Sequence, residues 1–131
     1  MDAGNLITES LHPLQKVTES VGMYSPYSCG DIAEWTHPET IEYMCVSESL
    51  LKKPNLAGGC VAISYNSLEA RELAYYWKNC ALKKECIAPE GSSRKNHRQD
   101  QAVLTILAHQ LGLTEKMPPR RLGFITHQDI G

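Results

Sequence analysis

The segment from residue 96 to residue 113, NHRQDQAVLTILAHQLGL, constrains the fold most, because a polar, basic loop runs there directly into an apolar helix. Asn96 and Gln99 are predicted to form a capping box at the start of this helix, and Gly112 to close its end in a left-handed cap. The apolar residues at helical spacing are Val103, Leu104, Leu107 and Leu111. A chain that contains such a stripe must bury it, so we expect a helix packed into a core.

Asp100 and Gln101 stand at the predicted start of this helix. A carboxylate in the first turn gains about 0.3–1 kcal/mol from the helix dipole, so Asp100 alone is compatible with a purely structural role. The surroundings are unusual, however, because four basic side chains flank the pair: Arg94, Lys95, His97 and Arg98. We interpret the combination as a site for a polyanionic or polyhydroxylated ligand.

Length and composition describe an ordinary globular chain. The 131 residues are 42% hydrophobic and 21% charged, which predicts a single domain over residues 1–131 that buries about two-thirds of its extended surface. The formal net charge of −2 argues against a dedicated nucleic-acid binder, although the basic loop at 92–98 leaves an RNA-contacting or phosphate-contacting domain as a weaker alternative. No run is apolar enough to span a bilayer, and residues 1–20 lack the pattern of a signal peptide.

The five cysteines do not form a CxxC pair, so a zinc site is not expected. Cys80 and Cys86 bracket a short turn after a predicted helix, where they can form a disulfide in an oxidising compartment. For the other cysteines, buried free thiols are an equally good interpretation.

The pattern of the whole chain predicts a mixed α/β fold. The expected elements are a strand end at 2–7, a loop at 21–35, helices at 38–51 and 67–82, a buried strand at 60–65 and a last strand at 122–126. Thr36 with Glu39 is predicted to cap the first of these helices, and Asn66 with Glu69 the second.

Two short segments outside the basic loop are candidates for binding chemistry. Asp2 lies at a predicted strand end and is followed by small residues, which suits a divalent cation but also an ordinary turn. In the segment 55–59, Gly58 and Gly59 let the backbone approach a ligand closely, or equally serve a tight turn before a strand.

Late in the chain, His127 follows the last predicted strand. Its imidazole is suited to a metal or a phosphate, although a lone histidine often has no such role. Trp35, Tyr24 and Tyr27 are candidates for stacking on a sugar, with half-buried packing as the alternative.

The order of these segments resembles the C-terminal half of the GT-A glycosyltransferases, and most closely the nucleotide-sugar transferases of the glycogenin type. The segments that carry the resemblance are Asp2, then Asn55 with Gly58 and Gly59, then Asp100, Gln101 and Leu104, then His127. The stretches 35–38 and 77–80 are also similar to segments of uncharacterised animal glycosyltransferase-like domains.

This resemblance implies a partial GT-A domain, Rossmann-like, with a mixed short sheet and three main helices. It implies transfer of a hexose from a nucleotide-diphosphate sugar to a glycan or protein-linked acceptor, in the Golgi or secretory lumen. The glycogenin-type pattern implies retention at the anomeric centre, whereas the residues themselves leave retention and inversion open.

The resemblance also assigns roles to individual residues. It makes Asp100 and Gln101 catalytic, and it places Mn²⁺ or Mg²⁺ on Asp2 and His127. The residues that it implies for binding of the donor and acceptor are Asn55, Gly58, Gly59, Arg94 and Arg98.

The chain departs from the family pattern in two ways. The first motif reads Asp-Ala-Gly, without the second acidic residue of Asp-x-Asp, and the βαβ units that bind the nucleotide do not precede Asp2. The chain is therefore expected to be the C-terminal half of a catalytic domain, and the alternative function is a catalytically inactive, transferase-like binding module.

Overall fold

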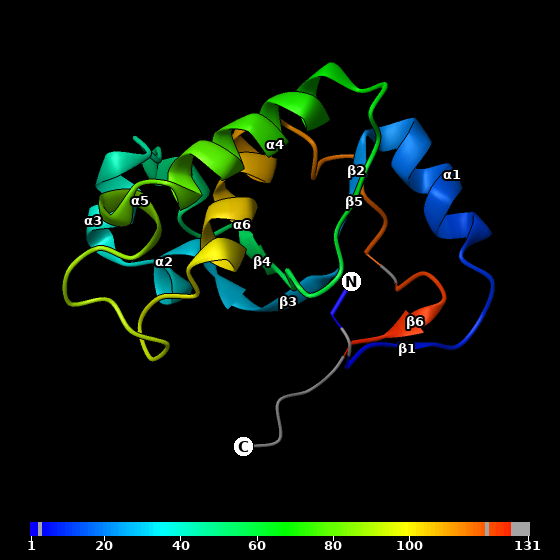
Figure 1. Ribbon diagram of the computed structural model, residues 1–131, viewed down its shortest axis with the longest axis horizontal. Coiled ribbons are helices and arrows are strands. Elements are labelled where there is room, and N and C mark those ends of the chain that lie inside the picture. Colours follow the sequence, from blue (N-terminus) through cyan, green and yellow to red (C-terminus); the bar gives the residue numbers. More distant parts are fainter. Residues whose placement is uncertain (3, 120, 127–131) are drawn as a thin grey trace.

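The computed structural model describes residues 1–2, 4–119 and 121–126, and these form a mixed α/β structure, as the sequence predicts (Figure 1). The helices are α1 (His12–Val21), α2 (Ile32–Trp35), α3 (Pro38–Tyr43), α4 (Leu68–Ala81), α5 (Lys84–Ile87) and α6 (Asp100–Gln110), with a 3₁₀ turn, η1, at Glu48–Leu50. The strands are β1 (Leu6–Ile7), β2 (Met23–Tyr24), β3 (Tyr27–Asp31), β4 (Pro54–Leu56), β5 (Ala62–Ile63) and β6 (Phe124–Ile125). None of the helices in these residues is long and apolar enough to cross a membrane.

The strands pair differently from the single mixed sheet that was expected. Within the described residues they form three two-stranded antiparallel ribbons, β1 with β6, β2 with β5 and β3 with β4. Strands of two to five residues offer too few ladder hydrogen bonds to build a wide sheet. The helices therefore supply most of the core.

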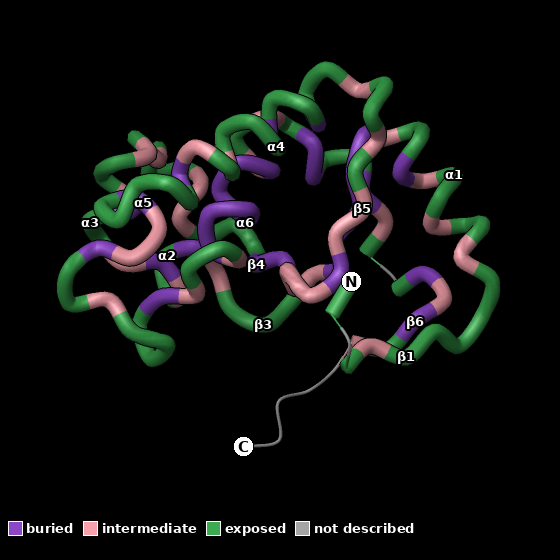
Figure 2. The backbone as a smooth tube through the Cα atoms, in the orientation of Figure 1, coloured by how far each residue is buried: buried purple, intermediate pink, exposed green. Residues whose placement is uncertain are grey.

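Helix α6 is the centre of the molecule and is buried more completely than its sequence predicts (Figure 2). All seven residues from Ala102 to Ala108 are buried, including Thr105 and Ile106, which lie off the predicted stripe. Thr105 is accommodated because its hydroxyl donates to the Gln101 carbonyl at 2.8 Å and accepts from the Leu56 amide at 3.1 Å. A side chain that satisfies its own polar group in this way can occupy the core at little cost.

Helix α1 is absent from the sequence prediction, although Leu14 and Val17 lie at helical spacing. These two side chains pack on a second, smaller apolar cluster around Tyr24 and Phe124, whose rings meet edge to face with centroids 6.2 Å apart. The predicted loop at 21–35 is also wrong, because it contains β2, β3 and α2. Tyr24 is completely buried in this cluster, so it is not the sugar-stacking residue considered above.

The predicted helices at 38–51 and 67–82 start within one residue of the expected position, but a different residue caps each of them. His37, rather than Thr36, caps α3 by accepting from the Glu39 amide at 3.2 Å through its ring nitrogen. Ser67, rather than Asn66, caps α4 by accepting from the Ala70 amide at 3.2 Å. In each case two adjacent polar residues are both able to cap a helix N-terminus. The path of the chain into the helix decides which of the two side chains reaches the free amide.

The predicted helix at 38–51 ends early. Helix α3 stops at Tyr43, and Cys45 adopts a left-handed conformation with φ of 51° before η1 begins. The predicted helix at 67–82 is confirmed as α4. The predicted strand segments shrink to two-residue strands, which are β1 within 2–7, β5 within 60–65 and β6 within 122–126.

The disulfide that the sequence allows is present, and it joins Cys80 near the end of α4 to Cys86 in α5. Of the other cysteines, Cys60 is a buried free thiol, which is the interpretation considered above. Cys29 and Cys45 are also free thiols, but they are exposed.

Candidate functional site

A polar cleft of about 1030 Å³ lies where the chain start, the β3–β4 ribbon and the start of α6 meet. It brings together eight of the nine residues assigned from the sequence: Asp2, Asn55, Gly58, Gly59, Arg94, Arg98, Asp100 and Gln101. The ninth, His127, lies outside the described residues, directly after Thr126, which lines the cleft. Segments almost one hundred residues apart in the sequence therefore share one cleft.

The glycine pair is what allows these segments to approach one another. A Cβ atom on Gly58, whose φ is +69°, would lie 3.1 Å from Cβ and Cγ of Gln101. A Cβ atom on Gly59 would lie 2.9 Å from the Asp2 carboxylate. The Gly59 carbonyl also accepts hydrogen bonds from the Asp2 amide at 2.7 Å and the Asn5 side chain at 2.8 Å. A side chain at position 58 would be strained at this φ and would displace Gln101 slightly, whereas one at position 59 would require the exposed Asp2 carboxylate to rotate away.

Asn55 is 1% exposed and lines the cleft, yet its Oδ1 atom has no hydrogen-bond partner among the described residues. An unsatisfied buried amide carbonyl costs about 1–3 kcal/mol. Because the Oδ1 atom is itself buried, a ligand would reach it only after the Asn55 side chain or its neighbours move.

Asp100 and Gln101 differ in how they are held. The Asp100 side chain is exposed and accepts from the Gln101 amide at 2.9 Å, while Trp77 Nε1 donates to the Asp100 carbonyl at 3.1 Å. The Gln101 side chain donates to the Leu56 carbonyl at 2.7 Å. The carboxylate of Asp100 is thus available to the cleft, and Gln101 fastens the start of α6 to β4.

Gln99 is a residue of the cleft that the sequence analysis did not assign to it. It is the N-cap of α6, with φ of 45° and ψ of −116°, and its side chain makes no capping hydrogen bond in the described structure. Asn96, which was predicted as the cap, instead accepts from the Ser93 amide at 2.7 Å within the preceding loop. A non-glycine residue in this region of φ/ψ space stores strain of about 1–3 kcal/mol, and such strain is typical of functional sites. Nothing in the local sequence signals it.

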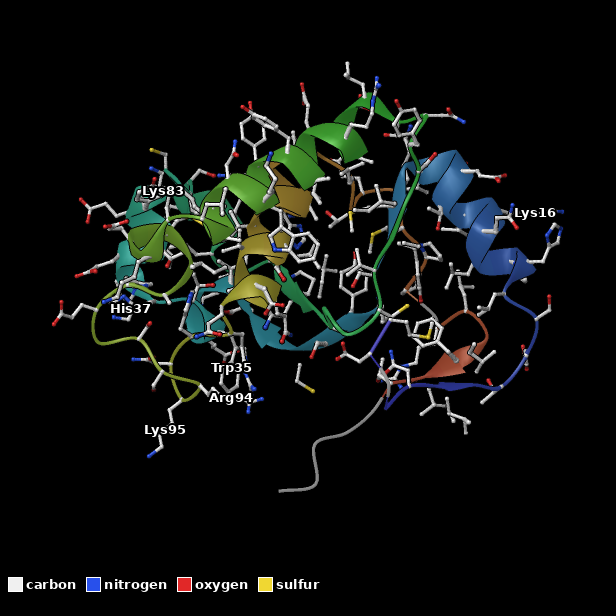
Figure 3. All side chains as sticks on the ribbon, in the orientation of Figure 1. Lys16, Trp35, His37, Lys83, Arg94 and Lys95 are labelled. Carbon is white, nitrogen blue, oxygen red and sulfur yellow. A yellow bond between two sulfur atoms is a disulfide. The ribbon has the colours of Figure 1, made fainter. Side chains whose placement is uncertain are left out.

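The guanidinium group of Arg98 lies over the ring of Trp35, 4.2 Å from the ring centroid. The Arg98 amide also donates to the Trp35 carbonyl at 3.0 Å, so two contacts hold this arginine in place. Trp35 and Arg94, both labelled in Figure 3, line the cleft with Arg98. Because Arg98 covers the Trp35 ring, the aromatic group presents a cation to the cleft rather than a bare face for a sugar.

His97 belongs to the basic loop in sequence but is completely buried. Its Nδ1 atom accepts from the His37 amide at 3.1 Å and its Nε2 atom lies 2.9 Å from the Ile87 carbonyl, which requires the neutral ring with hydrogen on Nε2. Burial lowers the pKa of His97 below its ordinary value, which agrees with this neutral form. The loop therefore presents arginines and Lys95, and not His97, to an external ligand.

The charge of the cleft is mixed. Its described lining carries three arginines, Arg94, Arg98 and Arg121, and two carboxylates, Asp2 and Asp100. Tyr27 also lines it, and its hydroxyl donates to the Thr114 carbonyl at 3.3 Å while burial raises its pKa. Such a combination suits a ligand with both anionic groups and hydroxyls.

The oxygen atoms of Asp2 are the donors that Mn²⁺ and Mg²⁺ prefer, and the Asp2 side chain is exposed at the cleft. Within the described part of the chain, no group of three or more histidine, cysteine or acidic side chains is placed to hold a metal. Of the described residues, Asp2 is the one that the resemblance would make a ligand of such an ion.

No protein-family model, no curated protein and no solved structure matches this chain, so its function has to be argued from the cleft itself.

Proposed function

We propose that this chain contributes the sugar-transfer part of a GT-A nucleotide-sugar glycosyltransferase, with the polar cleft as its active site. The observation that carries the proposal is the convergence of Asp2, the 55–59 segment and Asp100 with Gln101 in one cleft. Their order along the chain resembles the family pattern, and their closeness in space is a separate observation.

The groups in the cleft match the charges of such a reaction. When a sugar leaves a nucleoside diphosphate, positive charge develops on the sugar ring and negative charge on the diphosphate. Arg98, held against Trp35, and Arg94 are placed to stabilise the departing diphosphate electrostatically. A divalent cation would add Lewis-acid stabilisation of the same group, with Asp2 and, in the family-like arrangement, His127 as its protein ligands.

Asp100 and Asn55 serve the sugar in this proposal. The exposed Asp100 carboxylate accepts hydrogen bonds from sugar hydroxyls and orients them, while Asn55, whose side chain is buried, shapes the floor of the cleft beneath the sugar. Gln101 is a positioning residue, because its side chain is already committed to the Leu56 carbonyl. The donor nucleotide, the acceptor and the compartment, a Golgi or secretory lumen, belong to the proposal through the resemblance.

The proposal is tested by calorimetric titration of the chain with uridine diphosphate, with and without Mn²⁺. We expect metal-dependent binding that is lost in Asp2→Ala and retained in Glu115→Gln, an exposed acidic residue outside the cleft. Binding without any transfer of sugar from uridine diphosphate sugars would favour the inactive binding module. Absence of binding would contradict a donor-diphosphate site on this chain by itself, and metal-dependent binding that Asp2→Ala leaves unchanged would contradict the placing of that site in the polar cleft.

A further inference from the structure

A second pocket lies at the opposite end of α6 from the polar cleft and differs from it in character. It has a volume of about 490 Å³ and lies among α3, α4, α5 and the last turn of α6. The disulfide between Cys80 and Cys86 forms part of its wall, so we call it the disulfide pocket. Lys83, at its edge, lies far from Trp35 and Arg94 in Figure 3.

The disulfide pocket has an apolar floor and an apolar rim. Leu107 and Met44 lie in its floor, while Tyr43 and Tyr76, each 50% exposed, and Leu82, 73% exposed, stand at its rim. Exposed apolar side chains that are scattered singly over a surface are common, but a cluster of them around a pocket indicates a binding surface. The volume falls within the range of about 300–1,000 Å³ that is typical of small-molecule sites.

The charge at the rim selects the kind of ligand. Of the described residues that line the disulfide pocket, Lys83 is the one charged side chain, and no carboxylate lines it. Asn79 and Gln110 add amide groups at the edge. A ligand that fits has an apolar body and a single anionic head group.

We infer that the disulfide pocket binds a small amphipathic anion, with an aryl or alkyl body on Leu107 and Met44 and a carboxylate or sulfonate paired with Lys83. The site does not depend on the proposed transferase function. The disulfide sustains its shape, because Cys80 and Cys86 are both buried and hold α5 against the end of α4.

The first experiment uses the fluorescence of anilinonaphthalene sulfonate with the oxidised, folded chain. We expect saturable binding, competition by decanoate, and weaker competition by decanol or decyltrimethylammonium. Equal competition by the cationic and anionic decyl compounds would overturn the assignment to an anion, and absence of saturable binding would overturn the site. Concentration-dependent dimerisation that removes binding would show that a second copy of the chain covers the pocket, and would also overturn the proposal.

Paired variants locate the site. Lys83→Glu is expected to weaken decanoate binding about fivefold, as befits an exposed ion pair, whereas Lys84→Glu makes the same charge change one residue outside the pocket lining and is expected to have little effect. Tyr76→Ala is expected to weaken binding of both decanoate and decanol, in contrast to Tyr65→Ala, which alters an exposed residue that does not line the pocket. Identical effects within either pair would overturn the location.

Reduction of the Cys80–Cys86 bond supplies an independent readout. Reduced chain that still shows its native circular dichroism is expected to lose most decanoate binding while it retains the polar cleft. Binding that survives reduction unchanged would contradict the role of the disulfide as a wall of the site. For chain that unfolds on reduction, the Lys83→Glu and Lys84→Glu pair remains the deciding test.

Discussion

The two ends of α6 differ in how their free backbone groups are capped. At its C-terminal end, the Gly112 amide donates to the His109 carbonyl at 3.2 Å and the Leu113 amide to the Ala108 carbonyl at 3.0 Å, which is a complete Schellman motif. At its N-terminal end, Gln99 is strained and makes no side-chain cap in the described structure. The regular end adjoins the apolar pocket and the strained end adjoins the polar cleft, so the departure from good helix chemistry coincides with the proposed active site.

The strained end persists because other contacts determine its position. The Arg98 amide bonds to the Trp35 carbonyl, Trp77 bonds to the Asp100 carbonyl and Gln101 bonds to the Leu56 carbonyl. These three contacts come from α2, α4 and β4, and together they offset the unfavourable backbone of Gln99. Strain that the surrounding structure sustains in this way keeps a site in one geometry before a ligand arrives.

Asp100→Asn should have the largest effect, because it removes the carboxylate from the polar end of α6 while it preserves shape. Under the transferase proposal we expect sugar transfer by the full-length parent to fall by about 10²-fold or more, with the free energy of unfolding changed by at most about 1 kcal/mol, which is the contribution of the helix dipole. Steady-state assays with a nucleotide sugar, together with urea denaturation, measure both. Glu115→Gln, beyond the other end of the helix, is the control. A near-normal rate for Asp100→Asn would remove this residue from the catalytic role.

Gly58→Ala and Gly112→Ala sharpen the comparison, since both glycines have φ near +70° and flank opposite ends of α6. The new methyl group meets Gln101 at position 58, whereas at position 112 it meets no described atom within 4 Å. We therefore expect a loss of unfolding free energy of about 2–3 kcal/mol for Gly58→Ala and about 1 kcal/mol for Gly112→Ala. Urea denaturation distinguishes them, and equal losses would show that the approach of Gln101 to Gly58 can relax freely.

The pH dependence of stability should come from both ends of the helix. Burial lowers the pKa of His97, near the start of α6, and of His109, in its last turn, below the ordinary value of 6.5. Because the unfolded chain binds these protons more readily, the stabilisation is complete above about pH 6.5 and is lost as the pH falls through the lowered pKa values.

We expect the free energy of unfolding to decrease from about pH 7.5 to about pH 5.5, by at most about 1.4 kcal/mol per pH unit for each histidine. His97→Gln and His109→Gln should each remove part of this dependence in urea titrations. A flat profile for the unsubstituted chain would contradict the neutral forms that the contacts to Ile87 and Pro54 indicate.

Gln99→Gly should have the smallest effect and the opposite sign. Glycine adopts a φ of 45° with ψ of −116° without a clash, so relief of strain should exceed the added entropy of the unfolded chain. We expect a gain of about 1 kcal/mol in unfolding free energy. Thermal denaturation measures this gain, and a loss of stability would show that the Gln99 side chain contributes contacts worth more than the strain.

Much of the candidate site was predictable because its residue types are distinctive. Asp100 and Gln101 at a helix start, and a glycine pair before a strand, are visible in the sequence, as is the pair of cysteines that forms the disulfide. The orphaned Oδ1 of Asn55 and the strain at Gln99 were not predictable, since both depend on which distant groups surround them. The fold was predicted less well, because ribbons of two-residue strands leave almost no periodic signal.

The sequence by itself determined the elements whose cause is local. The apolar run after Asp100 forms a helix, Gly112 ends it, and Cys80 lies close enough to Cys86 in the chain to bond with it. Tertiary structure decided between outcomes that the local sequence favours equally. Ser67 rather than Asn66 caps α4, and His97 is buried rather than exposed. It also decided that Gln101 approaches Gly58 and that Asp2 approaches Gly59. Spacing along a chain reports one element at a time, whereas burial and contact depend on the packing of all the elements together.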